Sequence, residues 1–221
     1  MHQYNFRAGH LMTVGRTIET PACVAEGAAW LSAQDPHFAD ALALTGPLPL
    51  RRKPDGFAQL LSAIVSQQVS VAAANAIWNR LRAAKLTGPR KILWASDEDL
   101  RAAGLSRQKI RYARALAEAR IDFKALRDVP TEDVIAELTQ ISGIGIWTAE
   151  IYAMFSLGRA DVFAPGDLAL QESARLLFDL PERPKERALR DMAAAWSPWR
   201  SVAARLLWAY YHVAKDREGI R

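Results

Sequence analysis

The chain has 221 residues, half of them apolar, and a formal charge of +5 at neutral pH. This length allows one large domain or two small lobes with a sizeable core. The mild basic excess suits a polyanionic partner without requiring one. A single cysteine, Cys23, excludes disulfide frameworks, cysteine-rich zinc sites and iron–sulfur clusters, and the four histidines have no metal-ligand spacing.

The N-terminal stretch lacks targeting signals. Residues 1–16 have no apolar core of the kind that a secretory signal needs, and we expect them to form a flexible segment. No apolar run approaches the roughly 20 residues of a membrane span. The sequence therefore predicts a cytoplasmic protein that does not contact the membrane.

Helix-start signals recur along the whole chain and predict about ten to twelve helices. No period-2 alternation of useful length is present, so the predicted fold class is all-α. Polar capping residues, several of them followed by proline at the first helical position, mark the starts. They are Thr20, Asp35, Asp55, Ser70, Ser96, Thr131 and Ser197.

Two segments of the first half carry polar groups of interest. Gln67 and Gln68 lie between two apolar helices; their amides could hydrogen-bond bases, or they could satisfy helix-end backbone groups. Residues 106–120 predict an amphipathic helix with an outward basic face. A solvated face is the default interpretation of this basic stripe, and a phosphate-facing role is the alternative. The stripe comprises Arg107, Lys109, Arg111 and Arg114.

Residues 131–167 predict a helix, a tight turn and a largely buried second helix. The turn is Gly143-Ile144-Gly145, and its glycines free backbone N–H groups at a helix N-terminus, an arrangement that favours phosphate. An ordinary turn between two helices is the plainer alternative. A dinucleotide-binding loop would need a preceding strand, but the segment that begins at Thr131 is acidic at its start and helical in period.

Asp167 follows a mostly apolar loop and is the best catalytic candidate, because a partly desolvated carboxylate exerts a strong field on a nearby developing cation. It could equally be a helix N-cap, and the two roles are compatible. Several aromatic residues surround this stretch. Most must belong to the core, but a few could stack on a planar cationic base. They are Trp147, Tyr152, Phe155, Phe163, Trp196, Trp199 and Trp208.

Four separated motifs together resemble the helix-hairpin-helix DNA glycosylase superfamily, and more narrowly its DNA-3-methyladenine glycosylase II branch. The resemblance covers roughly residues 20–215. The matching pieces are IVSQQVSVA at 64–72, ISGIGIWTA at 141–149, DVFAPGD at 161–167 and WSPWRSVA at 196–203. It implies a two-lobed helical fold, with a middle lobe of about 57–165 inside a domain of 17–221, and no additional N-terminal α/β domain.

The resemblance also implies an activity. Such enzymes flip an alkylated base, of the 3-methyladenine or 7-methylguanine type, out of double-stranded DNA and cleave its N-glycosidic bond in base excision repair. Asp167 takes the catalytic position. Bifunctional members carry a lysine where this chain has Trp147, which implies a hydrolytic glycosylase without lyase activity. No cofactor is required, and a monomer, associated with the nucleoid if the source is bacterial, is expected.

Residue roles carry over from the resemblance by position. The amides of Gly143, Gly145 and Thr148 are expected to hold DNA phosphates, and Gln68, beside Gln67, occupies the place of a wedge residue that is leucine in a known enzyme of the branch. The expected base-pocket aromatics are Trp147, Trp199, Tyr152 and Phe163, with Ile151 standing where the branch has tyrosine. The expected ligands of Na⁺ or K⁺ at the hairpin are the carbonyls of Thr139, Ile141 and Ile144.

Two other interpretations stay open. A helix-hairpin-helix module could bind DNA without catalysis, although such a binder needs neither Asp167 nor the Gln67-Gln68 pair. A glycosylase for oxidised or deaminated bases would use the same residues on a different lesion.

Overall fold

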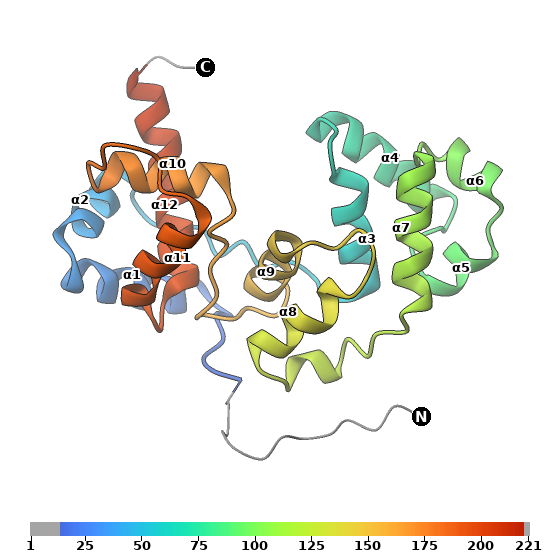
Figure 1. The fold of residues 1–221 in the computed structure, drawn as a ribbon, viewed down its shortest axis with the longest axis horizontal. Coiled ribbons are helices and arrows are strands. Elements are labelled where there is room, and N and C mark those ends of the chain that lie inside the picture. The colour runs from blue at the N-terminus through green and yellow to red at the C-terminus, as the bar shows by residue number, and fades with distance from the viewer. Residues whose placement is uncertain (1–13, 219–221) are drawn as a thin grey trace.

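The computed structural model describes residues 14–218, which form twelve α-helices, two 3₁₀ helices and no strand (Figure 1). The all-α prediction is confirmed. No helix in this range is both long and apolar enough to cross a membrane. The helices are α1 (Pro21–Gln34), α2 (Pro36–Thr45), α3 (Phe57–Ser66), α4 (Val71–Ala83), α5 (Pro89–Trp94), α6 (Asp97–Ala102), α7 (Arg107–Glu118), η1 (Ala125–Arg127), α8 (Thr131–Thr139), α9 (Ile146–Phe155), α10 (Leu168–Leu177), α11 (Glu186–Ala193), η2 (Ala194–Trp196) and α12 (Arg200–Glu218).

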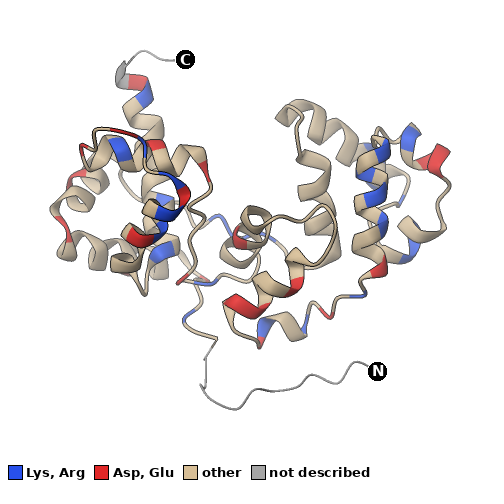
Figure 2. Cartoon of the chain, in the orientation of Figure 1, with Lys and Arg blue, Asp and Glu red and all other residues tan. Residues whose placement is uncertain are grey.

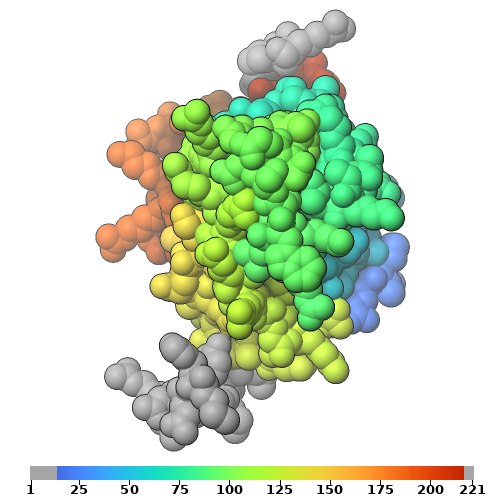
Figure 3. All heavy atoms as spheres, turned by 90° about the vertical axis from the view of Figure 1, so that its right-hand side faces the viewer, coloured from blue at the N-terminus to red at the C-terminus, as the bar shows by residue number. Residues whose placement is uncertain are grey.

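Two hydrophobic cores divide the described chain into two lobes (Figure 1). The middle-lobe core runs from Phe57 to Leu157, whereas the terminal-lobe core combines residues 18–48 with residues 153–207. Residues 160–164 therefore pack with the terminal lobe, although the sequence had suggested a middle lobe reaching about 165. Helix α9 contributes to both cores and lies between the lobes, and in the end view of Figure 3 helices α4 to α7 of the middle lobe face the viewer.

A buried arginine ties distant segments together through backbone carbonyls. Arg159, which is 1% exposed, donates hydrogen bonds to the Val14 carbonyl and to three carbonyls between residues 126 and 129. The Arg16 carbonyl accepts a hydrogen bond from Ala160 N at 2.9 Å. Residues 14–16 of the predicted flexible segment are thus held against the terminal lobe, and residues 1–13 lie outside the described residues.

Most predicted helix starts are confirmed, because the polar caps satisfy free N–H groups. The side chains of Thr20, Asp35 and Ser70 accept hydrogen bonds from the first turns of α1, α2 and α4. Ser96 forms a reciprocal capping box on α6, and Ser106 caps α7.

Three predicted caps were wrong. Thr131 is the first residue of α8 behind Pro130 and makes no capping bond. Gly56 precedes α3, while Asp55 instead pairs with Arg127 at 2.6 Å. Ser197 precedes a cis peptide bond to proline and donates to Asp161 at 2.8 Å, so α12 begins only at Arg200.

The basic stripe of α7 is only partly solvated, although Figure 2 shows basic residues all along this helix. Lys109 is 9% exposed, and its Nζ donates to the Val65 carbonyl at the end of α3, 2.6 Å away. Burial lowers the pKa of Lys109. Arg114 donates to carbonyls of α5 and pairs with Asp97 at 2.7 Å. Two of the four predicted outward cations therefore hold neighbouring helix ends, which their long stems allow them to reach.

Candidate functional site

The hairpin between α8 and α9 leaves helix N–H groups open. Ile144 is 4% exposed and anchors the turn in the middle-lobe core, with its N–H bonded to the Ile141 carbonyl at 3.0 Å. Gly145 is the N-cap of α9 and makes no side-chain capping bond. The first amides of α9 therefore lack a protein acceptor and carry the positive end of the helix dipole. Such an end can bind an anion.

The two hairpin glycines have different reasons to be glycine. Gly143 has φ +93°, and a Cβ there would lie 2.3 Å from Cγ of Tyr112, so both its backbone and its neighbour exclude a side chain. Gly145 has an ordinary φ of −88°, and a Cβ there would meet no atom within 4 Å. The fold thus requires glycine at position 143, whereas glycine at position 145 leaves the surface at the N-terminus of α9 uncovered.

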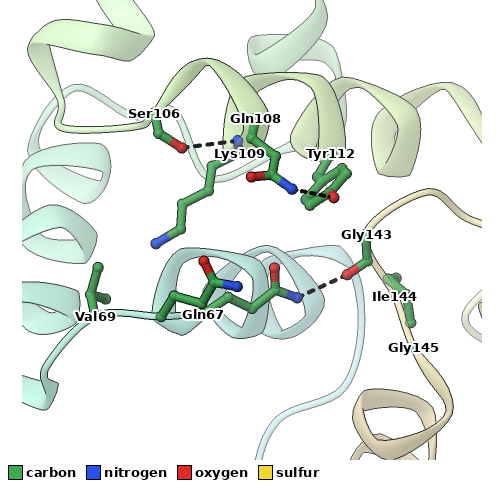
Figure 4. Close-up of a pocket in the computed structure, with 10 residues that line it drawn as sticks. Gln67, Val69, Ser106, Gln108, Lys109, Tyr112, Gly143, Ile144 and Gly145 are labelled. Carbon is green, nitrogen blue, oxygen red and sulfur yellow. Dashed lines mark hydrogen bonds between the residues drawn. The ribbon is translucent and has the colours of Figure 1, made fainter.

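A groove of about 660 Å³ joins the hairpin turn to the α3–α4 loop and the start of α7 (Figure 4). Gln67 Nε2 donates to the Gly143 carbonyl at 2.8 Å and so fixes the two loops together. Gln68 adopts the left-handed region at φ +55°. Four of the predicted DNA-binding residues, Gln67, Gln68, Gly143 and Gly145, line this groove. The fifth, Thr148, is buried at the first turn of α9 and lines a different cavity.

Asp167 is held by four N–H donors. It caps α10: its Oδ1 accepts from Ala169 N at 2.9 Å and from Leu170 N at 3.1 Å. The indole of Trp208 donates to the same oxygen at 3.3 Å, and that of Trp147 donates to Oδ2 at 3.1 Å. The half-buried carboxylate therefore has a fixed direction, and its cap and candidate catalytic roles coexist.

The loop before Asp167 is fixed at both ends. Asp161 accepts hydrogen bonds from Arg200 at 2.6 Å and from Ser197 at 2.8 Å. Burial alone would raise the pKa of Asp161, but these hydrogen bonds outweigh burial and hold the pKa below its usual value. Nearer the candidate acid, Gln171 Nε2 donates to the Pro165 carbonyl at 2.8 Å. These contacts hold the whole loop, and with it Asp167, against the terminal lobe.

A cavity of about 220 Å³ lies between α3 and α9, with Trp147 and Tyr152 in its wall. Tyr152 is 3% exposed, and its hydroxyl accepts a hydrogen bond from Gly56 N at 2.8 Å. Burial raises the pKa of Tyr152 to about 12. Gln59 and Ser62 add polar groups to the wall. Because Trp147 also donates to Asp167, its indole links one wall of this cavity to the carboxylate.

The structure places the other two predicted pocket aromatics in the core of the terminal lobe. Trp199 is 4% exposed, packs against α1 at Gly27 and lies under the guanidinium of Arg16. Phe163 is 5% exposed and meets Trp196 edge to face at 5.2 Å. Neither lines the cavity beside Trp147.

Trp208 is a second aromatic at Asp167. The sequence placed it among the aromatics around this stretch but did not assign it to the base pocket. It comes from α12, is half-buried, and its ring lies 5.8 Å from that of Phe155.

No side-chain metal site was found: the described residues contain no group of three or more His, Cys, Asp or Glu that could hold an ion. A cation at the hairpin would therefore depend on backbone carbonyls. Of the three expected ones, the Ile141 carbonyl already accepts the Ile144 N–H, and Thr139 is the last residue of α8.

Comparisons with known proteins agree with this geometry. Residues 61–199 match the HhH-GPD superfamily base excision DNA repair protein family. DNA-3-methyladenine glycosylase 1 of Schizosaccharomyces pombe is 32% identical over 203 residues, covering 86% of this chain and 89% of the relative. The chain belongs to the HhH-GPD superfamily of base excision DNA repair proteins.

Solved structures support the same assignment. The crystal structure of a DNA-3-methyladenine glycosidase from Bacillus halodurans matches with a TM-score of 0.78 at 36% identity, over 91% of this chain and 94% of that chain. A 3-methyladenine DNA glycosylase of Schizosaccharomyces pombe in complex with abasic DNA matches with a TM-score of 0.73 at 33% identity, over 83% of this chain and 95% of that chain. The resemblance drawn from the four sequence motifs is confirmed.

Proposed function

We propose that the protein is a monofunctional DNA glycosylase that hydrolyses the N-glycosidic bond of alkylated purines in double-stranded DNA, 3-methyladenine and 7-methylguanine among them. The observation that carries the proposal is the half-buried Asp167 carboxylate, which is held by four N–H donors. One of these donors, Trp147, also lines a cavity. The names of the related glycosylases support the same substrate class.

The chemistry follows from a fixed anion near the sugar. Cleavage of the N-glycosidic bond builds positive charge on the sugar, and a partly desolvated carboxylate stabilises that charge more than water would. In this proposal Asp167 also orients the attacking water. An alkylated purine already carries positive charge and leaves readily, so the reaction needs little general acid.

A base flipped out of the helix would enter the cavity beside Trp147. At about 220 Å³ it is smaller than pockets for drug-sized ligands, which begin near roughly 300 Å³, and suits a single nucleobase. Indole and phenol rings stack on planar cations. Trp147 can therefore serve both the base and the carboxylate, whereas Tyr152 is fixed in the wall by its hydrogen bond to Gly56.

The surface around the site suits a DNA backbone. Gly145 leaves the N-terminus of α9 open to a phosphate, and Gln68 projects from the strained α3–α4 loop, where it could fill the gap left by the flipped base. Among the described residues, five of the seven exposed large hydrophobic side chains lie on this loop, the hairpin or beside Asp167, so they mark one contact face. They are Val69, Val71, Ile146, Trp147 and Leu168.

The absence of lyase activity is part of the proposal. Trp147 occupies the position that a Schiff-base lysine takes in bifunctional relatives, and an indole cannot attack the sugar. Lys53 lines the cavity, so borohydride trapping is the direct test. We expect no covalent enzyme–DNA adduct, and a trapped adduct that disappears in Lys53→Gln would replace hydrolysis with lyase chemistry.

Two further features complete the proposal. A Na⁺ or K⁺ ion held by the carbonyls of Thr139, Ile141 and Ile144 would bridge the hairpin to a phosphate, and DNA affinity should then depend on which monovalent cation is present. We also expect the protein to act as a monomer, since each chain contains the hairpin, the groove and Asp167.

The test of the function is base release. Duplexes carrying 3-methyladenine, 7-methylguanine, hypoxanthine, 1,N6-ethenoadenine or 8-oxoguanine are incubated with the protein, and the freed bases are identified by mass spectrometry. Release of the methylated purines is expected. Release of only deaminated or oxidised bases would change the substrate class, and DNA binding without any release would indicate a non-catalytic binding module.

A further inference from the structure

Glu150 is a buried acid that the proposed reaction does not use. It is 2% exposed and lies in α9, three residues beyond Trp147, so both side chains share one face of the helix. Its ion-pair partner among the described residues is Arg190, whose Nη2 lies 3.3 Å from Glu150 Oε1. Burying a carboxylate this deeply costs folding free energy unless the charge is paired, so the stability of the ionised form depends on its partner.

The pair links the helix between the lobes to the terminal lobe. Glu150 belongs to α9, the second helix of the hairpin, whereas Arg190 belongs to α11, which packs in the terminal lobe. Arg190 also pairs with Glu186 at 2.9 Å. A Cβ built on Gly166 would lie 3.6 Å from Glu186 Oε2, so the same cluster borders the residue immediately before Asp167.

The face of α9 therefore makes two polar contacts to the terminal lobe. Trp147 meets the Asp167 carboxylate at one, and Glu150 meets Arg190 at the other, one helical turn further along. Two contacts on one face restrain α9 from rotating about its own axis. They therefore fix the distance and orientation between the N-terminus of α9, which is proposed to bind DNA, and the Asp167 carboxylate.

We propose that Glu150 is a positioning residue, whose ionised carboxylate ties α9 through Arg190 to α11 and so fixes Asp167 relative to the hairpin. The proposal rests on the proposed function for its effect on catalysis, but its structural part stands on the contacts alone. It assigns Glu150 no contact with the substrate.

The protonation state of Glu150 changes near neutral pH. Burial raises its pKa to about 7, Arg190 opposes this rise, and Glu186 adds to it. Among the described residues these two are the charged groups that act on it, and both come from α11. As the pH falls through 7, Glu150 takes up a proton, the ion pair with Arg190 is lost, and the tie between the lobes weakens.

The test compares Glu150→Gln and Arg190→Gln with the wild type across pH values on both sides of 7. A matched control is Glu98→Gln, which breaks an exposed pair with Arg101 on α6, far from the site along the chain. Single-turnover base release and DNA affinity are measured separately. In Glu150→Gln we expect release to slow by about tenfold without a change in affinity, since a 1 Å misplacement can cost roughly 100-fold.

The pH profile separates positioning from bulk stability. Wild type should lose activity as Glu150 is protonated. Glu150→Gln and Arg190→Gln should both be slow at every pH, because either change breaks the ion pair whatever the charge of the remaining partner. Glu98→Gln should follow wild type. An unchanged rate together with an unchanged acid limb in Glu150→Gln would overturn the proposal.

A readout without turnover tests the same idea independently of the proposed activity. The indole N–H signals of Trp147 and Trp208 in NMR spectra report the hydrogen bonds to Asp167. They should shift with pH around 7 in the wild type and lose that transition in Glu150→Gln. Indole signals that titrate identically in both proteins would refute the proposal even if no base were released.

Discussion

Replacing the two hairpin glycines one at a time separates the fold from the DNA surface. In Gly143→Ala the new methyl group needs φ +93° and a position 2.3 Å from Cγ of Tyr112. A non-glycine residue in a rarely populated backbone region costs roughly 1–3 kcal/mol. Overpacking a neighbour adds typically about 1–3 kcal/mol. Alanine regains about 0.4–1 kcal/mol by restricting the unfolded chain.

The net loss of unfolding free energy for Gly143→Ala is therefore roughly 2–5 kcal/mol. For a domain of this size 1 kcal/mol moves Tm by about 2–4 °C, so Tm should fall by roughly 4–20 °C. Movement of the turn would also disturb the 2.8 Å hydrogen bond from Gln67 Nε2 to the Gly143 carbonyl.

Gly145→Ala should behave in the opposite way. Its φ of −88° suits alanine, and the methyl group meets no atom within 4 Å. The gain from the unfolded state, about 0.4–1 kcal/mol, is offset by the poorer N-cap. Stability should thus stay close to wild type, while the methyl group occupies the surface offered to a phosphate.

Both variants are measured by urea unfolding and by fluorescence anisotropy with a duplex that carries an uncleavable abasic site. Gly145→Ala should keep its unfolding midpoint and lose about tenfold in affinity, which corresponds to about 1.4 kcal/mol. Equal destabilisation of the two variants would refute the steric argument. Unchanged DNA affinity in Gly145→Ala would refute the role of the open helix end.

Two other changes test the surroundings of the acid. Trp208→Phe keeps a ring against Phe155 but removes one of the four N–H donors to Asp167. Base release should therefore slow by roughly tenfold, with little change in DNA affinity. A wild-type rate of release would show that this hydrogen bond does not contribute to catalysis. The raised pKa of Glu150 means that the folded state binds a proton more tightly than the unfolded state between the reference pKa of 4.5 and about 7. Unfolding free energy should therefore fall as pH rises through this window, by at most about 1.4 kcal/mol per unit, and urea titrations of Glu150→Gln should lack this slope.

The sequence predicted what depends on local pattern. The all-α class, the caps at Thr20, Asp35 and Ser70, and the capping position of Asp167 all follow from short-range rules that the structure obeys. The sequence also predicted that the hairpin turn depends on Gly143 and Gly145. It did not predict that only Gly143 is required for steric reasons. That difference depends on Tyr112, about thirty residues away in sequence.

What failed depends on tertiary contacts. Trp199 was expected at the pocket, but α12 begins only at Arg200, so Trp199 precedes the helix and turns towards α1, while Trp208 reaches Asp167. Lys109 read as an outward cation because its neighbours are basic, yet its stem reaches the end of α3. Glu150 lies in an apolar helix, and its partner Arg190 is forty residues away, so no sequence pattern could join them.

The central claim is that Asp167 drives hydrolysis of an alkylated base. Asparagine is nearly the same size and is also a good N-cap, so Asp167→Asn should keep α10 and the fold while removing the negative charge. Single-turnover release of 3-methyladenine from duplex DNA is the measurement, with affinity for the same duplex as the control. We predict a loss of at least about 100-fold in rate with affinity retained. Wild-type release by Asp167→Asn would contradict the assignment.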